Sequence, residues 1–191
     1  MVVKRLLAIL FVIVLAGVVV LSYRSGPSSQ KSYQNPLSKL PPESQETVVD
    51  SPDGTIKLVM TKKKNQNGAL IYSFSTKEES GKSLKIFEKT ATFGEEMSLP
   101  QNSFSPDNKY LFIKDTNGYK TDYLVFRVNG EPFSTGEEFI NATELFDQKV
   151  KGYNLKSLTG WDDPVLMNIL TVNGPRFWFD ITTRSFIQLV S

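Results

Sequence analysis

The chain has 191 residues, enough for one domain with a sizeable core, and carries 22 basic and 20 acidic residues. It contains no histidine and no cysteine, which excludes Ser-His-Asp triads, thiol nucleophiles, histidine-ligated zinc and disulfides. Lys4 and Arg5 account for the net charge of +2, and the rest of the chain is neutral. A neutral domain without a basic block argues against nucleic acid as a partner.

The first element in chain order is an uninterrupted apolar run at residues 6–21, directly after Lys4 and Arg5. A membrane-spanning helix needs about 20 apolar residues, and basic residues before the span favour a cytoplasmic N-terminus. Residues 1–23 are therefore predicted to be a cytoplasmic tip and a transmembrane signal-anchor that contacts the lipid bilayer through residues 6–21. This topology predicts a single-pass protein of the cell membrane, with an extracytoplasmic C-terminal domain.

A cleaved signal peptide, which would release a secreted protein, is the alternative interpretation of this segment. Signal peptides have an apolar core of about 7–15 residues and a cleavage site flanked by small residues. The run here is longer than that, and the sequence Val20-Leu21-Ser22 is a poor cleavage site. Residues 24–49, rich in Ser, Pro and Gln, are predicted to form a disordered linker because they can bury little apolar surface.

A pattern of turns and alternating strands begins at residue 50 and extends to residue 191. The turn sequence Ser51-Pro52-Asp53-Gly54 recurs as Ser105-Pro106-Asp107-Asn108, after Phe104. A third, degenerate copy is Gly160-Trp161-Asp162-Asp163-Pro164. The alternating segments predicted as strands are 55–61, 69–76, 83–88, 109–114, 122–128, 165–172, 176–181 and 185–190. One helix is expected, over residues 136–150.

These turn openings are separated by 54 and 57 residues, a period typical of one propeller blade with about four strands. The pattern of an aromatic residue, Ser-Pro-Asp-Gly/Asn and an alternating strand resembles the TolB-like (WD-like) β-propeller repeat, most clearly over Phe104–Val128. The resemblance implies a scaffold for protein–protein contacts. Closed propellers have about 4–8 blades, so three copies predict an all-β fold of antiparallel, propeller-like blades that is open or atypically closed.

The aromatic residues near the C-terminus are the candidate partner surface. Phe177 and Phe179 share one face of a predicted strand, and Trp178 occupies the other face. Trp178 and Trp161 are therefore candidates for contact with a partner, on the last blade, which no following blade covers. No catalytic residue, metal ligand or cofactor site is predicted.

The sequence thus predicts a non-catalytic, membrane-anchored binding or scaffolding module of a bacterial cell envelope, with a protein partner there. The alternative is a carboxylate-dependent envelope hydrolase that acts on glycans. It would need two carboxylates about 5–9.5 Å apart across a cleft. The adjacent acidic pairs Glu95-Glu96, Glu137-Glu138 and Asp162-Asp163 cannot supply this alone, because neighbouring residues of a strand point to opposite faces.

Overall fold

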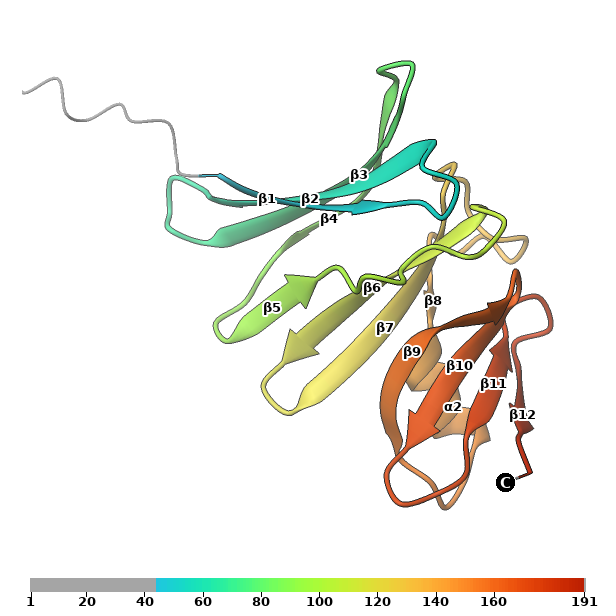
Figure 1. Cartoon of the computed structure of the whole chain (residues 1–191). Helices are drawn as coiled ribbons and strands as arrows, with labels where there is room; N and C mark the ends of the chain where they lie inside the picture. The colour runs from blue at the N-terminus through green and yellow to red at the C-terminus, as the bar shows by residue number, and fades with distance from the viewer. Residues whose placement is uncertain (1–43, 191) are drawn as a thin grey trace, which may run out of the picture. The chain divides into compact units, whose positions relative to one another are not determined.

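The computed structural model describes residues 44–190, which form three four-stranded antiparallel sheets and one short helix (Figure 1). Sheet 1 contains β1 (Gln45–Asp50), β2 (Ile56–Lys64), β3 (Leu70–Glu78) and β4 (Ser83–Thr90). Sheet 2 contains β5 (Glu95–Ser98), β6 (Tyr110–Asn117), β7 (Lys120–Arg127) and β8 (Ile140–Asn141). Helix α2 (Ala142–Lys149) precedes sheet 3, which contains β9 (Leu155–Asp163), β10 (Leu166–Thr171), β11 (Phe177–Asp180) and β12 (Ser185–Gln188).

In each sheet the strands are neighbours in the order in which they occur in the chain. The three sheets follow one another along the domain in the manner of propeller blades (Figure 1). The prediction of antiparallel, blade-like sheets is thereby confirmed, in a domain that is mostly β with one short helix. Within residues 44–190 no helix is long and apolar enough to cross a membrane. The predicted anchor at residues 1–23 lies outside the described residues.

Two hydrophobic cores hold the sheets together, and sheet 2 contributes to both. Leu111 and Ile113 of β6 point into the core shared with sheet 1, whereas Phe112 between them points into the core shared with sheet 3 and α2. All three side chains are fully buried. A strand covered on both faces must be apolar at successive positions, which explains why β6 is continuously hydrophobic over these residues.

The repeated Ser-Pro-Asp turns have the same hydrogen-bonding network. Ser51 Oγ donates to Asp53 Oδ1 at 2.7 Å and accepts from the Ile56 backbone N–H at 3.0 Å. The second copy repeats both bonds with Ser105, Asp107 and Tyr110, at 2.8 and 3.0 Å. The fourth turn positions, Gly54 and Asn108, both have positive φ angles of 75° and 58°, a conformation that Gly and Asn tolerate best. The two copies are therefore structural as well as sequence repeats.

We expect the Asp53 carboxyl to titrate with a pKa of about 2, because the Thr55 backbone N–H and the hydroxyls of Ser51 and Thr55 hydrogen-bond to its ionised form. A depressed pKa means that the stabilising effect of this turn is present above the ordinary value of 3.8 and is lost as the pH falls towards 2. Carbon-detected NMR titration of the aspartate side chains measures this directly. A midpoint for Asp53 at the ordinary value would contradict the hydrogen-bonded turn.

Three expectations about element boundaries are wrong. β1 begins at Gln45, so residues 45–49 of the expected linker are a strand, which pairs with β2 from Gln45↔Lys62 to Asp50↔Lys57. The helix covers only Ala142–Lys149, because the Asn141 side chain accepts the Glu144 backbone N–H at 3.1 Å and starts it there. In the third repeat, Gly160–Asp163 belong to β9 and not to a turn.

Candidate functional site

The two faces of sheet 3 differ in their surroundings. Phe177 and Phe179 of β11 are buried in the core shared with sheet 2 and α2, at 4% and 0% exposure. Trp178 between them is half-buried and lies on the other face, opposite Ile187 of β12, which is 45% exposed. The predicted alternation is confirmed, and Trp178 lies on the face of sheet 3 that contributes to neither hydrophobic core.

A polar network fixes Trp178 on this face. Its indole Nε1 donates to Asp162 Oδ2 at 2.5 Å. The Asn168 Nδ2 atom donates to both Asp162 oxygens, at 3.1 and 3.0 Å. The three residues come from adjacent strands, β11, β10 and β9, and Asn168 pairs directly with Trp178 in the sheet register. Because hydrogen bonds to an ionised carboxylate are stronger than those between neutral groups, Asp162 orients both side chains. Trp178, Asp162 and Asn168 are called the tryptophan network below.

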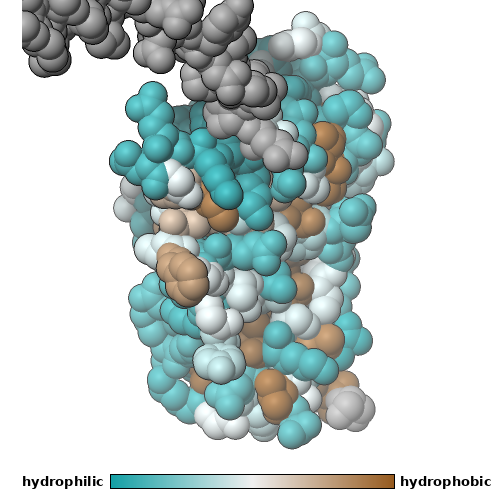
Figure 2. All heavy atoms as spheres, turned by 90° about the vertical axis from the view of Figure 1, so that its left-hand side faces the viewer, coloured by the Kyte–Doolittle hydropathy of each residue, from teal (hydrophilic) through white to brown (hydrophobic). Residues whose placement is uncertain are grey.

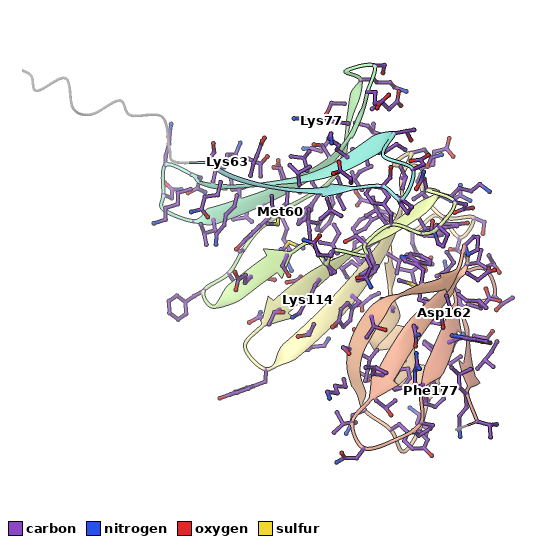
Figure 3. All side chains as sticks on the ribbon, in the orientation of Figure 1. Met60, Lys63, Lys77, Lys114, Asp162 and Phe177 are labelled. Atoms are coloured by element: carbon purple, nitrogen blue, oxygen red, sulfur yellow. The ribbon has the colours of Figure 1, made fainter. Side chains whose placement is uncertain are left out.

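Asn168 also has an unused hydrogen-bonding atom. The residue is 6% exposed, and its Oδ1 has no hydrogen-bond partner among the described residues. A cavity of about 290 Å³ lies beside it, lined by Asp162, Asn168, Trp161 and residues of the Ser-Pro-Asp turns, Pro52 and Pro106. Buried polar atoms usually have a partner, so this carbonyl is an exception in the interior of sheet 3. Figure 3 shows where Asp162 lies on sheet 3, the sheet that also carries Phe177.

Trp161 has a different role from the one expected. Its Nε1 donates to the Ser103 carbonyl at 3.1 Å, and its ring lies 6.4 Å from those of Tyr110 and Phe112. Tyr110 and Phe112 belong to β6, so Trp161 joins sheet 3 to sheet 2. Its indole is engaged in packing between sheets, and its role as a partner contact remains a prediction.

A charged cluster joins sheets 1 and 2. Lys89 Nζ of β4 lies 2.7 Å from Asp115 Oδ2 of β6 and also forms an ion pair with Glu95 of β5. Burial raises the pKa of the Asp115 carboxyl despite the ammonium group. Burial acts in the same direction on Glu95, but hydrogen bonds from Lys89 and Thr92 outweigh it and lower the pKa of that carboxyl. One cation thus holds two carboxylates whose pKa values move in opposite directions.

The acidic pairs seen in the sequence are separated in the structure. Glu137 binds Arg184, and their hydrogen bonds lower the pKa of Glu137 to about 2. Asp162 and Asp163 are both exposed, but Asp162 belongs to the tryptophan network and Asp163 lies at the end of β9. Among residues 44–190 no group of three or more acidic side chains has the geometry of a metal site.

Comparisons with known proteins provide a fold likeness. A scan of protein-family models finds no match, and a search of curated proteins finds no relative. Among solved structures, the chain is similar to a variant of the AtxE2 isopeptidase bound to astexin3-dC4, a β-propeller-containing protein. The match has a TM-score of 0.50 at 9% sequence identity and covers 78% of this chain and 31% of that chain. At this identity the likeness shows the fold alone, and the chain spans less than a third of the length of the structure that it matches.

Sequence reasoning found Trp178 but missed the other members of the network. Strand alternation sufficed for Trp178, because β11 is regular from Phe177 to Asp180. Asp162 and Asn168 meet across a β9–β10 pairing whose register shifts three times. β-Bulges of this kind cannot be located from periodicity. The network is suited to recognition, since it presents an oriented indole beside an exposed carboxylate on one surface.

Proposed function

We propose that this protein is a non-catalytic binding or scaffolding module, anchored in the membrane by residues 6–21 and exposed outside the cytoplasm, that binds a protein partner through sheet 3. We also propose that its sheets are repeats of the TolB-like class. The hydrogen-bonding network that recurs in the turns of Ser51 and Ser105 supports this assignment. Repeats of that class imply protein–protein contacts.

The tryptophan network is the observation that carries the proposal. Trp178 is a large aromatic side chain with its polar atom already satisfied by Asp162, so little of its freedom remains to be lost on binding. Oriented tryptophans surrounded by polar groups are typical centres of protein interfaces. Ile187, directly opposite in the register and half-exposed, supplies adjoining apolar surface.

Site-specific photocrosslinking in native membranes tests the partner surface. A photoreactive amino acid at Ile187 is expected to crosslink to one protein, whereas the same group at Lys77, exposed on sheet 1, gives no such product. Both positions are strand positions with an accessible side chain, so the pair is matched. Equal crosslinking from both positions, or from neither, would contradict a partner surface on sheet 3.

A reporter fused after Ser191 tests the membrane topology. A reporter active only outside the cytoplasm should function there, because one predicted crossing follows Lys4 and Arg5. The fusion protein should also resist extraction from membranes by alkaline carbonate. Activity of a cytoplasm-specific reporter would refute the topology, and release by carbonate would favour the secreted alternative.

The alternative, a carboxylate-dependent glycan hydrolase, has one specific observation in its favour. The pKa values of Glu95 and Asp115 move apart, as they do in acid–base pairs. Their shared contact with Lys89 gives them a structural role that needs no substrate. Hydrolysis of envelope glycans by the purified chain, abolished by both Glu95→Gln and Asp115→Asn, would establish the enzyme.

A further inference from the structure

Two of the exposed aromatic side chains of the domain lie at the same end of its sheets. Phe93 and Tyr119 are fully exposed, and Tyr153 is 37% exposed. Phe93 lies between β4 and β5, Tyr119 between β6 and β7, and Tyr153 between α2 and β9. Single exposed apolar residues need no explanation, but Phe93 and Tyr119 are the aromatic residues of the described range that are fully exposed, whereas the Tyr153 ring packs against Phe177.

Strand register places the loops that carry Phe93 and Tyr119 at the same end of the sheets. Glu95 pairs with Asn117, which also pairs with Lys120, so the loop carrying Phe93 adjoins the hairpin carrying Tyr119. In sheet 1, β4 ends at Thr90 and β1 begins at Gln45 at the end of the sheet that carries the Phe93 loop. Figure 1 shows the starts of β1 and β5 and the β6–β7 hairpin on its left-hand side. We call this end the loop face.

The loops of the loop face are ordered by their own hydrogen bonds. The Thr92 N–H and hydroxyl donate to Glu95 Oε2 at 2.8 and 3.0 Å, and Gly94 has a φ of 80°. Tyr119 follows Gly118, whose φ of 59° closes a two-residue hairpin. Neither ring packs into a core, although the backbone that carries each of them is fixed. The turns therefore hold both aromatic rings out into the surroundings.

Basic residues border these rings. Lys63 and Lys64 are exposed at the end of β2, and Lys120 follows Tyr119. Two of the nearby acids, Glu95 and Asp115, are buried and share the single cation of Lys89, whereas Glu96, near Phe93, is exposed. Figure 2 views this side and shows a mostly hydrophilic surface on which hydrophobic atoms form separate spots rather than one continuous patch.

We infer that the loop face rests on an anionic lipid bilayer, with Phe93 and Tyr119 at the headgroup level and the lysines near lipid phosphates; this inference rests on the proposed membrane anchoring. Aromatic rings favour the membrane interface, and lysines are attracted to anionic lipids. On the part of this side that grey atoms do not cover, Figure 2 shows separate hydrophobic spots within a hydrophilic surface, as expected for isolated rings that insert at the headgroup level. The chain also enters the domain on the loop face, at Gln45, after the predicted span.

The absence of cysteine from the chain permits a direct test with single labels. The full chain, carrying Phe93→Cys or Tyr119→Cys with an environment-sensitive fluorophore, is reconstituted into vesicles of phosphatidylglycerol and phosphatidylcholine. Ser80→Cys, exposed in the β3–β4 turn at the opposite end of the strands, is the matched control. Lipids that carry a nitroxide just below the headgroup are expected to quench labels 93 and 119 at least twofold more than label 80, and less so in pure phosphatidylcholine.

Vesicle flotation of the same samples separates this inference from the anchoring. Flotation with equal quenching at all three labels overturns the docking and leaves the anchor intact. Flotation only with anionic vesicles, lost in a Phe93→Ser/Tyr119→Ser variant, supports docking and refutes the anchor. No flotation with either vesicle overturns both. Labels 93 and 119 that remain unquenched but crosslink to a protein in native membranes would assign the loop face to a protein partner instead.

Discussion

Replacing Phe179 by alanine is expected to lower the free energy of unfolding by about 3–5 kcal/mol, the usual cost of removing a buried aromatic ring. Phe179 is completely buried, and its ring stacks on Phe186 with centroids 4.8 Å apart. Phe177→Ala should have a similar effect, because that ring packs edge-on against Phe146 at 5.4 Å. Denaturant unfolding of the single variants measures both losses.

Trp178→Ala is the matched comparison within the same strand. It removes one hydrogen bond, to Asp162, and a half-buried ring, so the expected loss is about 1–2 kcal/mol. The difference between adjacent residues arises from which face of β11 each one occupies. A loss for Trp178→Ala equal to that of Phe179→Ala would show that both faces of sheet 3 are covered.

Replacing Lys89 by methionine is expected to cost about 2–3 kcal/mol at neutral pH, because it leaves two buried carboxylates without their cation. The side chains of Glu95 and Asp115 are 4% and 9% exposed. The loss should be smaller than for a fully buried pair, since Lys89 itself is 34% exposed. Chemical unfolding at several pH values measures it.

The pH dependence follows from the directions of the pKa shifts. In the unaltered protein the lowered pKa of Glu95 contributes stability above the ordinary value of 4.5, and this is lost as the pH falls through the folded-state pKa. In Lys89→Met the carboxylates protonate more readily, so the deficit should shrink as the pH falls. The variant Lys89→Met/Glu95→Gln/Asp115→Asn should recover most of the stability at neutral pH. An unchanged stability of Lys89→Met would mean that solvent already screens the cluster.

The strands that the sequence predicts well are those with a regular alternation and a defined turn before them. β2, β3, β6 and β7 belong to this group. β1 escaped detection because its sequence, QETVVD, has five exposed positions and its pairing depends on backbone groups. β5 is short, with Met97 as its fully buried apolar residue, and β9 contains bulges that break the period of two. Local pattern thus predicts strands with a regular alternation, including the edge strands β4 and β12, and misses strands that are short, bulged or dependent on a neighbour.

The same distinction applies to the candidate site. Trp178 could be placed on a face from sequence, since only the pleat of its own strand is involved. The contact with Asp162 requires the exact pairing of β9 with β10 and of β10 with β11, which is tertiary information. Glu137 was expected near the start of a helix, but it lies before the helix and binds Arg184, 47 residues away. No short-range pattern contains such a contact.

The measurement that tests the binding proposal most directly is photocrosslinking from Ile187 in native membranes, compared between the unaltered chain and Trp178→Ala. Thermal unfolding followed by the fluorescence of Trp161, which lies between sheets 2 and 3, verifies that the variant is folded. The proposal predicts that folded Trp178→Ala loses the crosslinked partner. A folded variant that retains the same crosslink with the same yield would contradict a binding surface built on Trp178.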